Sequence, residues 1–370
     1  MTAAAPMPAD PDAGLTVADH TPETFAAAMA RRGWRVGRSR ALLRTLYTGR
    51  TPRADRFGQP VAAWAMSLRR SPTAVVQRHV ARDGTVKLLV GLDDGQAVEC
   101  VLMDSDTPGL VSGCISSQVG CAMGCDFCAS TLEGVKRDLT AAELVGQFFH
   151  LRDEAAASGR RLATLVLMGM GEPMLNLDAV IPALRRISTE DGAQFGSRNI
   201  QVSTVGIVPG IRQLAESGLR VQLALSLHGP DDATRSAIVP AGRKYTVAEV
   251  LDAAWAYQLA TGRVTNIEYC LLADVNDTVE HARRLVVALA GRAMHVNLIP
   301  YNPIGAGLSG RAYQRPGKRA MVTFLQVLRD GGVVAHIRKT RGDDRDAACG
   351  QLRRRALPVL ATRAPLPGPF

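Results

Sequence analysis

Three cysteines lie close together in the stretch Cys121-Ala-Met-Gly-Cys125-Asp-Phe-Cys128. Thiolates are the natural ligands of iron–sulfur clusters, so each cysteine can bind one iron of a 4Fe-4S cubane. The fourth iron then stays open for a ligand that is not a protein side chain. The amino and carboxylate groups of S-adenosylmethionine (SAM) can chelate that iron, and one electron then cleaves SAM to methionine and a 5′-deoxyadenosyl radical. The spacing therefore predicts radical SAM chemistry.

Zinc is the main alternative for these thiols. A structural zinc site normally has four protein ligands, and Cys114 or Cys349 could supply the fourth. Counting cysteines therefore leaves zinc open, whereas the spacing and the strand pattern around the loop favour the cluster. Seven cysteines in 370 residues are too few for a disulfide framework.

The elements that must position this loop follow a regular alternation. Strand-like apolar runs occur at residues 111–116, 163–168, 199–204, 219–225, 264–271 and 294–299, with a further run at 333–339. Helical periodicity fills most of the gaps, at residues 140–152, 177–187, 247–259 and 278–289. Alternating strands and helices predict a parallel sheet, and six units are too few to close an eight-fold barrel. We therefore expect an α/β fold with an open, partial (β/α)6 barrel of radical SAM type over residues 109–352.

Polar residues at the carboxyl ends of these strands form a candidate SAM site, because barrels bind their ligands at that face. Gly171 and Glu172 follow the second strand, where exposed carbonyls or the Glu172 carboxylate could hold the SAM ammonium group. The other candidates follow the third, fourth and sixth strands: Ser203, Ser226, Leu227, His228 and Asn302. For each polar residue alone, a role in a turn or a cap is an equally good explanation. Phe127 could cover the adenine ring or simply pack the loop.

The N-terminal region is rich in arginine. Nine arginines against one acid, Asp55, lie between residues 31 and 56, and Trp34 and Tyr47 lie among them. Arginine together with aromatic side chains is typical of an RNA-binding surface. A solvated helical face with two aromatic residues in its core explains the same stretch equally well.

The patterns divide the chain into five segments. A first helix begins at the N-cap Thr21 and a second covers residues 39–47. The stretch Asp93-Asp94-Gly95 between two apolar runs is a strong hairpin signal. We therefore expect two disordered tails, a helical, arginine-rich RNA-binding domain, a linking β-hairpin and the barrel, over residues 1–20 and 353–370, 21–84, 85–108 and 109–352.

The charge of the chain favours a polyanionic partner. There are 44 lysines and arginines against 34 acids, so the net charge is +10. No apolar run reaches the roughly 18 residues of a membrane span. The first residues lack the basic start and apolar middle of a signal peptide. We expect a cytoplasmic protein that acts as a monomer and has no membrane partner.

The remaining cysteines fall into two groups. Cys114 lies on the strand that leads to the cluster loop, and Cys349 lies among small residues that suggest an accessible segment. Cys100 and Cys270 fall inside apolar strand patterns, where burial as an inert thiol is the usual fate. Glu99 has apolar neighbours on the hairpin strand, so its side chain points either to solvent or toward the site.

With these residues, the chain resembles the RlmN/Cfr family of radical SAM RNA methyltransferases from about Glu99 to Leu352. The N-terminal domain matches only loosely; in relatives it is a small helical RNA-binding module. Besides the cluster loop, the matching stretches are Cys114-Ile-Ser-Ser-Gln-Val-Gly-Cys121, Met168-Gly-Met-Gly-Glu-Pro-Met-Leu-Asn176, Leu225-Ser-Leu-His228, Asn297-Leu-Ile-Pro-Tyr-Asn302 and Lys339-Thr-Arg-Gly-Asp-Asp-Arg-Asp-Ala-Ala-Cys-Gly-Gln-Leu352.

The resemblance implies a reaction that consumes two SAM molecules per turnover. One SAM would methylate the Cys349 thiolate, and a second, bound at the cluster, would supply the adenosyl radical. That radical would take a hydrogen from the S-methyl group, and the resulting carbon radical would add to an adenine ring carbon. Glu99 is implied as the base that removes the ring proton. Cys114 is implied to attack the sulfur of Cys349, which releases the base and leaves a transient disulfide.

The resemblance favours carbon 2 of an adenosine in 23S ribosomal RNA, with an adenosine in tRNA as a second candidate substrate. A Cfr-like methylation of carbon 8, or another RNA target, is the nearest alternative. A radical SAM activase or small-molecule enzyme would not need Cys349, and a zinc-stabilised RNA-binding protein would have no catalysis. The expected partners are RNA, an electron donor such as flavodoxin or ferredoxin, and a thiol reductant.

Overall fold

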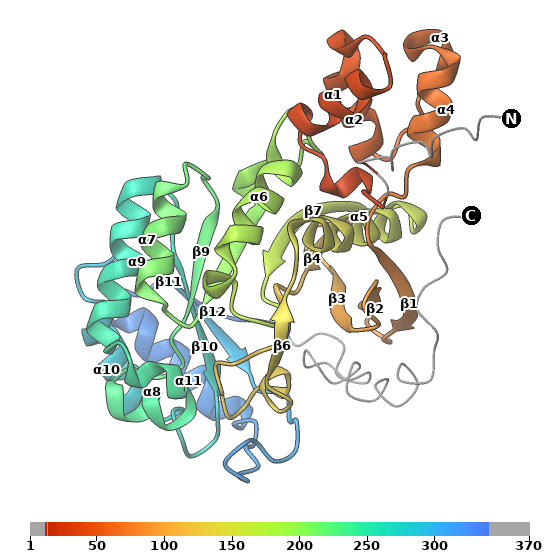
Figure 1. Cartoon of the computed structure of the whole chain (residues 1–370). Helices are drawn as coiled ribbons and strands as arrows, with labels where there is room; N and C mark the ends of the chain where they lie inside the picture. Colours follow the sequence, from red (N-terminus) through yellow and green to blue (C-terminus); the bar gives the residue numbers. More distant parts are fainter. Residues whose placement is uncertain (1–11, 13, 340–370) are drawn as a thin grey trace, which may run out of the picture.

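One large β-sheet forms the centre of the molecule (Figure 1). The computed structural model describes residue 12 and residues 14–339. In this part of the chain the sheet has ten strands in the order β1-β2-β3-β4-β7-β8-β9-β10-β11-β12, and β5 pairs with β6 separately. The strands are β1 (Thr73–Val80), β2 (Val86–Leu92), β3 (Ala97–Asp104), β4 (Leu110–Cys114), β5 (Gln118–Gly120), β6 (Val135–Asp138), β7 (Arg161–Leu167), β8 (Ile200–Thr204), β9 (Gln222–Ser226), β10 (Asn266–Leu271), β11 (His295–Pro300) and β12 (Ala335–Ile337).

From β4 to β12 the main sheet is parallel, because every neighbouring pair of strands runs in the same direction. Parallel neighbours require crossover connections, and helices supply them. These helices are α5 (Ala141–Ala157), α6 (Leu177–Ser188), α7 (Val208–Glu216), α8 (Asp232–Ile238), α9 (Val247–Thr261), α10 (Val279–Leu289) and α11 (Lys318–Asp330). Figure 1 shows α7, α9 and α10 along the outer side of the sheet. The open (β/α)6 barrel is confirmed, with β12 added after the sixth unit.

Successive side chains along each strand point to opposite faces of the sheet. In β8, Ile200 and Val202 are buried in the main hydrophobic core, beneath the helices. Gln201 and Ser203 point to the opposite face and are only half-buried. We call this opposite face, which carries Gln201 and Ser203, the interior face of the barrel.

The helices begin where the sequence supplies a cap. Thr140, Thr246 and Thr278 stand directly before α5, α9 and α10, and each hydroxyl accepts a hydrogen bond from a backbone N–H of the first turn. At α5 the Glu143 carboxylate returns the contact by accepting from the Thr140 N–H at 2.8 Å. Among the helices of the described residues, none is both long and apolar enough to cross a membrane.

The predicted hairpin forms, as β2 and β3, but it is part of the main sheet. Its second strand pairs antiparallel with β4, so that Val101 lies opposite Cys114. An additional strand, β1, pairs with β2 and lies within the segment predicted to be helical. The run Thr73–Val80 contains the β-branched residues Thr73, Val75 and Val76, which favour an extended strand. The sheet therefore continues from the barrel to the edge of the N-terminal domain.

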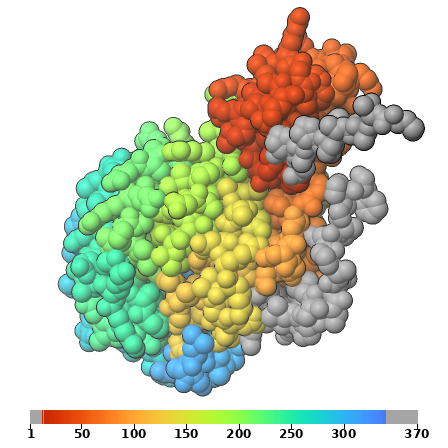
Figure 2. Space-filling view, viewed as in Figure 1, coloured from red at the N-terminus to blue at the C-terminus, as the bar shows by residue number. Residues whose placement is uncertain are grey.

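The N-terminal helices form a lobe that projects from the body of the molecule (Figure 2). They are α1 (Pro22–Arg31), α2 (Ser39–Tyr47), α3 (Ala54–Phe57) and α4 (Gln59–Ser67). The first begins directly after its predicted cap Thr21, and the second has its predicted bounds. Trp64 packs against Phe25 and Trp34 at ring distances of 5.3 and 5.2 Å. Tyr47 is fully buried and contacts Phe149 of α5, so it is a core residue and does not face RNA.

The predicted N-terminal tail includes residues that are folded in the structure. Residues 17–19 form a short 3-10 helix in which Val17 and Ala18 are buried, so the predicted tail over residues 1–20 was wrong for this part. The N–H groups of Val17 and Ala18 donate to the carbonyls of Arg69 and Arg70, which hold the segment against the end of α4. The C-terminal tail predicted over residues 353–370 lies outside the described residues.

Candidate functional site

The cluster loop lies between β5 and β6 and turns sharply around glycines. Gly120 and Gly124 have φ angles of 83° and 71°, where side chains other than glycine are strained. A Cβ on Gly120 would lie 1.9 Å from the Gly134 carbonyl oxygen, so only glycine fits this approach. Inside the loop the Cys128 N–H donates to the Cys125 carbonyl at 3.0 Å, which closes the turn.

The three thiols of the loop interact with one another. Cys121 and Cys125 are buried and Cys128 is half-buried. Burial raises the pKa of Cys121 to about 12 and that of Cys125 well above its ordinary value, and the neighbouring thiolate of Cys128 raises both further. Three thiolates this close repel one another unless they bind a cation, and bound iron would deprotonate them.

The donor set fits a cluster whose irons are bound one per thiolate. Among the described residues, no three His, Cys, Asp or Glu side chains are arranged around a single metal ion. A cubane does not need such convergence, because each cysteine binds its own iron. The part of the chain that the structure describes contains no disulfide, so these thiols are not joined to one another.

The Gly-Met-Gly-Glu segment after β7 packs directly against the approach to the cluster loop. A Cβ on Gly169 would lie 2.7 Å from the Ile115 carbonyl oxygen, and one on Gly171 would lie 2.6 Å from the Gln118 side chain. Gly171 also has a φ angle of 100°. The Glu172 N–H donates to the Gln118 side chain at 2.8 Å. The glycines thus place the end of β7 beside β5.

The Glu172 carboxylate already has hydrogen-bond partners within the protein. It accepts hydrogen bonds from the N–H groups of Met174 and Val205 at 3.1 and 2.9 Å, and it is buried. Burial raises the pKa of Glu172 to about 7, although these hydrogen bonds oppose the shift. The carboxylate therefore ties the end of β7 to the end of β8, on the carboxyl side of the sheet.

The predicted serines lie on the interior face. Ser203 stands beside Ala224 of the next strand, and Ser226 stands beside Glu268 of the strand after that. Ser203 donates its hydroxyl hydrogen to the Leu167 carbonyl at 2.6 Å. Because neighbours in register point to the same face, Ser203, Ser226 and Glu268 line one surface.

Leu227 and His228 leave β9 in different directions. Leu227 is completely buried, and its N–H donates to the Glu268 carbonyl at 3.0 Å. His228 has a φ angle of 59°, and its Nδ1 accepts from the Cys270 N–H at 3.0 Å. Burial lowers the pKa of His228 to about 3, which keeps the ring neutral. The Phe127 ring meets the His228 ring edge-on at 4.9 Å, so Phe127 joins the cluster loop to this turn.

Asn302 follows β11, and the cluster loop is tied to the same region. The Asn302 side-chain oxygen accepts a hydrogen bond from the Arg315 guanidinium. Asp126 lies between two of the loop cysteines, and its carboxylate accepts from the Ser309 N–H and the Tyr313 hydroxyl, each at 2.7 Å. The segment after β11 is thereby fixed against the loop. No sequence pattern indicates this role of Asp126, because its partners lie far along the chain.

Glu99 and Cys114 are brought to the interior face by strand register. Cys114 is aligned with Val166 of β7, which is aligned with Gln201 of β8, a residue of the interior face. Val101 lies opposite Cys114, and Glu99, two residues earlier on the same strand, points the same way. Glu99 and Cys114 are only 2% and 5% exposed. Of the two orientations open for Glu99, the structure has the one toward the site.

Lys87 is a candidate site residue that the sequence patterns missed. Its Nζ lies 3.2 Å from Oε2 of Glu99, and both side chains are buried. It falls inside an apolar run of β2, where periodicity alone assigns no function. Lys87 lies two positions before Leu89, which pairs with Glu99 across the two strands. This proximity becomes visible only once the strand register is known. Cys349, the other predicted thiol, lies outside the described residues.

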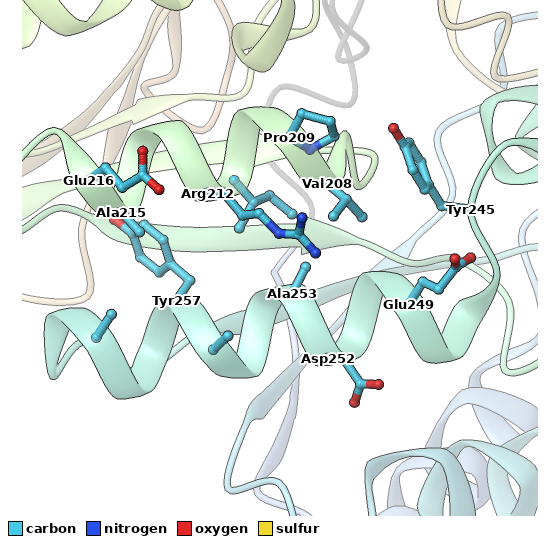
Figure 3. A pocket seen from close by; sticks show the side chains of 13 residues that line it. Val208, Pro209, Arg212, Ala215, Glu216, Tyr245, Glu249, Asp252, Ala253 and Tyr257 are labelled. Atoms are coloured by element: carbon cyan, nitrogen blue, oxygen red, sulfur yellow. The ribbon is translucent and has the colours of Figure 1, made fainter.

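A separate groove of about 710 Å³ lies between α7 and α9 (Figure 3). Pro209, Arg212, Ala253 and Tyr257 are among its lining residues, and none of the predicted site residues lines it. It belongs to the helical side of the sheet, opposite to the interior face.

Comparisons with known proteins agree with this geometry. Residues 115–286 match the Radical SAM superfamily. A protein of Opitutus terrae, named a probable dual-specificity RNA methyltransferase RlmN 1, is 48% identical over 91% of this chain and 96% of its own. A protein of Rhodopirellula baltica with the RlmN name is 42% identical over 90% of each chain. The crystal structure of a radical SAM methyltransferase from Sphaerobacter thermophilus superposes with a TM-score of 0.83 and 38% identity, over 91% of this chain and 98% of that one. The chain belongs to the RlmN family of radical SAM RNA methyltransferases.

Proposed function

We propose that this chain places a methyl group on a ring carbon of adenine in RNA. The proposal depends chiefly on one observation: Glu99 and Cys114 lie together on the interior face, on the strands that precede the cluster loop. A radical SAM activase, or an enzyme that only modifies a small molecule, has no need of a carboxylate and a thiol at that place. The names of the relatives support the same assignment.

The three loop cysteines, Cys121, Cys125 and Cys128, would hold the 4Fe-4S cluster. With SAM bound there, the cluster supplies the electron that yields a 5′-deoxyadenosyl radical. The polypeptide must fix SAM in one orientation. Because the Glu172 carboxylate already accepts two backbone N–H groups, we assign the SAM ammonium group to backbone carbonyls around Gly171. The remaining contacts would come from Ser203, Ser226, Asn302 and the turn formed by Leu227 and His228.

Two thiols would carry the methyl group and release it. Cys349 would take a methyl group from one SAM, because a thiolate is a good nucleophile. After hydrogen abstraction the methylene radical would join the adenine. The ring radical formed in this way would return one electron to the oxidised form of the one-electron donor and would lose its ring proton to Glu99. Cys114 would then attack the sulfur of Cys349: an S–S bond forms, and the C–S bond breaks. Its electron pair stays on the methylene carbon, which takes a proton to become the methyl group, and a thiol reductant reopens the disulfide.

Glu99 would accept the ring proton. Its ion pair with Lys87 supports this role, because the ammonium group fixes the carboxylate on the interior face. Lys87 also supplies a compensating charge to a carboxylate that the sheet buries, which otherwise would be costly. The two residues thus form one unit, in which Lys87 positions and Glu99 reacts.

We infer that the target is carbon 2 of an adenosine in 23S ribosomal RNA, with an adenosine of tRNA as a second substrate. The dual specificity in the names of the relatives supports two RNA classes. The net charge of +10 supports a polyanionic substrate. A carbon-8 methylation of the Cfr kind is the second candidate. The enzyme would act in the cytoplasm as a monomer, with flavodoxin or ferredoxin as electron donor.

Mass spectrometry of ribosomal and transfer RNA, from cells with and without the gene, tests the proposal. We expect that deletion removes 2-methyladenosine and that the wild-type gene restores it. A lost 8-methyladenosine would assign the chain to the second candidate. No change at any adenosine would refute RNA methylation.

Anaerobic reconstitution separates the remaining rivals. We expect a brown protein that cleaves SAM and loses RNA methylation when Cys349 is replaced with alanine. Full activity of Cys349→Ala would favour a radical SAM enzyme of another kind. A colourless protein with stoichiometric zinc and no SAM cleavage would favour an RNA-binding protein without catalysis.

A further inference from the structure

Arg235 of α8 is a buried cation that has no role in the proposed reaction. The residue is only 1% exposed and is the largest fully buried side chain in the part of the chain that the structure describes. Its guanidinium donates to the carbonyl oxygens of Val205 and Tyr245, while the buried Nε has no hydrogen-bond partner. Among the described residues no carboxylate forms an ion pair with it, and Asp232, an acid that acts on it electrostatically, is exposed to solvent.

The fold makes room for this side chain with two glycines. A Cβ on Gly229 would lie 2.6 Å from the Arg235 backbone nitrogen, and one on Gly242 would lie 2.7 Å from the guanidinium. Burying a charge is strongly unfavourable unless an opposite charge compensates it. Two carbonyl dipoles compensate only in part, so a negative group is expected nearby.

The cluster loop lies against the same helix. The Asp126 N–H donates to the Ile238 carbonyl at the end of α8, at 3.0 Å. Ile238 and Val239 pack in one apolar cluster with Cys125. The Arg235 guanidinium donates to the carbonyl of Val205, and Val205 packs against this same apolar cluster. Arg235 also lies one helical turn before Ile238 and Val239, so its side chain leaves α8 on the face that meets the loop. The expected negative group is therefore the set of three thiolates with their cluster.

We propose that Arg235 is the buried counter-charge of the cluster and raises its reduction potential. Three thiolates already give the oxidised cluster a negative charge, and the electron from an external one-electron donor adds another. A fixed cation beside Cys125 favours the reduced state, and burial protects its field from screening by salt. The inference rests on the cluster of the family and not on RNA as substrate, so its failure would leave the proposed function standing.

The test is a redox titration of the anaerobically reconstituted enzyme, followed by electron paramagnetic resonance of the reduced cluster. Arg235→Gln removes the charge, and Arg235→Lys keeps it while losing the guanidinium geometry. Arg243→Gln is the matched control, because Arg243 lies in the next turn of the chain and is exposed. At the wild-type midpoint, Arg235→Gln should lower the ratio of reduced to oxidised cluster at least tenfold, which equals about 59 mV for one electron.

Arg235→Lys and Arg243→Gln should change that ratio by less than about threefold, because the first retains a cation and the second removes only a screened one. Equal tenfold changes in the Lys and Gln variants would show that Arg235 acts as a strut for α8, which overturns the proposal. So would an unchanged ratio in Arg235→Gln.

A measurement on the wild-type enzyme alone covers the case in which the variants fail to fold. The ratio at fixed potential should change by less than about twofold between low and high salt, because a buried charge is little screened. A tenfold change with salt would place the controlling charge on the surface and contradict the assignment to Arg235.

Discussion

Replacing Lys87 with methionine is expected to destabilise the fold by about 3–5 kcal/mol. Nζ of Lys87 and Oε2 of Glu99 are 3.2 Å apart, and their side chains are 6% and 1% exposed. At an effective dielectric constant of about 20, their Coulomb attraction is about 5 kcal/mol. Removing one partner of a buried pair costs about 3–5 kcal/mol, because the other charge stays buried without its counter-charge.

A double-mutant cycle measures this coupling directly. Lys87→Met, Glu99→Leu and the double variant are unfolded in urea, and the free energy of unfolding is followed by circular dichroism. The double variant should lie within about 1–2 kcal/mol of wild type, since an apolar pair of similar volume can replace a buried ion pair. The two single changes together should therefore exceed the double change by at least about 3 kcal/mol.

The Arg78–Glu154 pair provides the control. It joins β1 to α5 with side chains 51% and 15% exposed, and surface pairs of this kind contribute about 0–1 kcal/mol. The same cycle at Arg78 and Glu154 should give a coupling in that range. If the two single substitutions lower the free energy of unfolding additively, Lys87 and Glu99 are not coupled. That result would contradict the proposal that Lys87 positions Glu99.

Further predictions concern the SAM turn, pH and the resolving thiol. Gly171→Ala should weaken SAM binding in calorimetry and cost about 1–3 kcal/mol of stability, because its φ is 100° and the new Cβ meets Gln118 at 2.6 Å. Normal SAM affinity would contradict the close packing. Burial lowers the pKa of His228 from 6.5 to about 3 in the folded protein. As pH falls below 6.5, the His228 ring therefore takes up a proton in the unfolded chain while it stays neutral in the folded protein. Stability should fall on acidification by up to about 1.4 kcal/mol per pH unit, and less steeply in His228→Gln, as measured by urea titration; equal slopes would speak against it. Cys114→Ala should trap RNA on Cys349 as a covalent adduct visible on a denaturing gel, and free turnover would exclude Cys114 as the resolving thiol.

Much of the fold could be predicted because its signals are local. The caps Thr21 and Thr140 mark helix starts through their own hydroxyls, and these starts are confirmed. The alternation along β8 shows which residues are buried, and the glycines at Gly169 and Gly171 mark a close approach of two backbones. The same local signals did not reveal α7, α8 or α11, and β1 lies in a segment that was predicted to be helical.

The electrostatic part of the site depends on contacts between distant segments. Lys87 reaches Glu99 only through the register of β2 and β3, and the helix of Arg235 meets Cys125 only where α8 packs on the loop. Neither position stands out in composition or spacing. Tyr47 shows the converse: a residue within an arginine-rich stretch that packs into the core against α5. The sequence therefore supplies the candidates for reacting groups, while the fold determines which charges surround them.

The most direct test of the account follows deuterium from SAM to RNA. Reconstituted enzyme is given SAM with a fully deuterated methyl group, a one-electron donor and ribosomal RNA, and the methylated adenosine is analysed by mass spectrometry. If the methyl group passes through Cys349 and loses one hydrogen to the adenosyl radical, the product should carry two deuterium atoms and one hydrogen from solvent. A product with three deuterium atoms would mean direct transfer from SAM and would contradict the role assigned to the thiol pair.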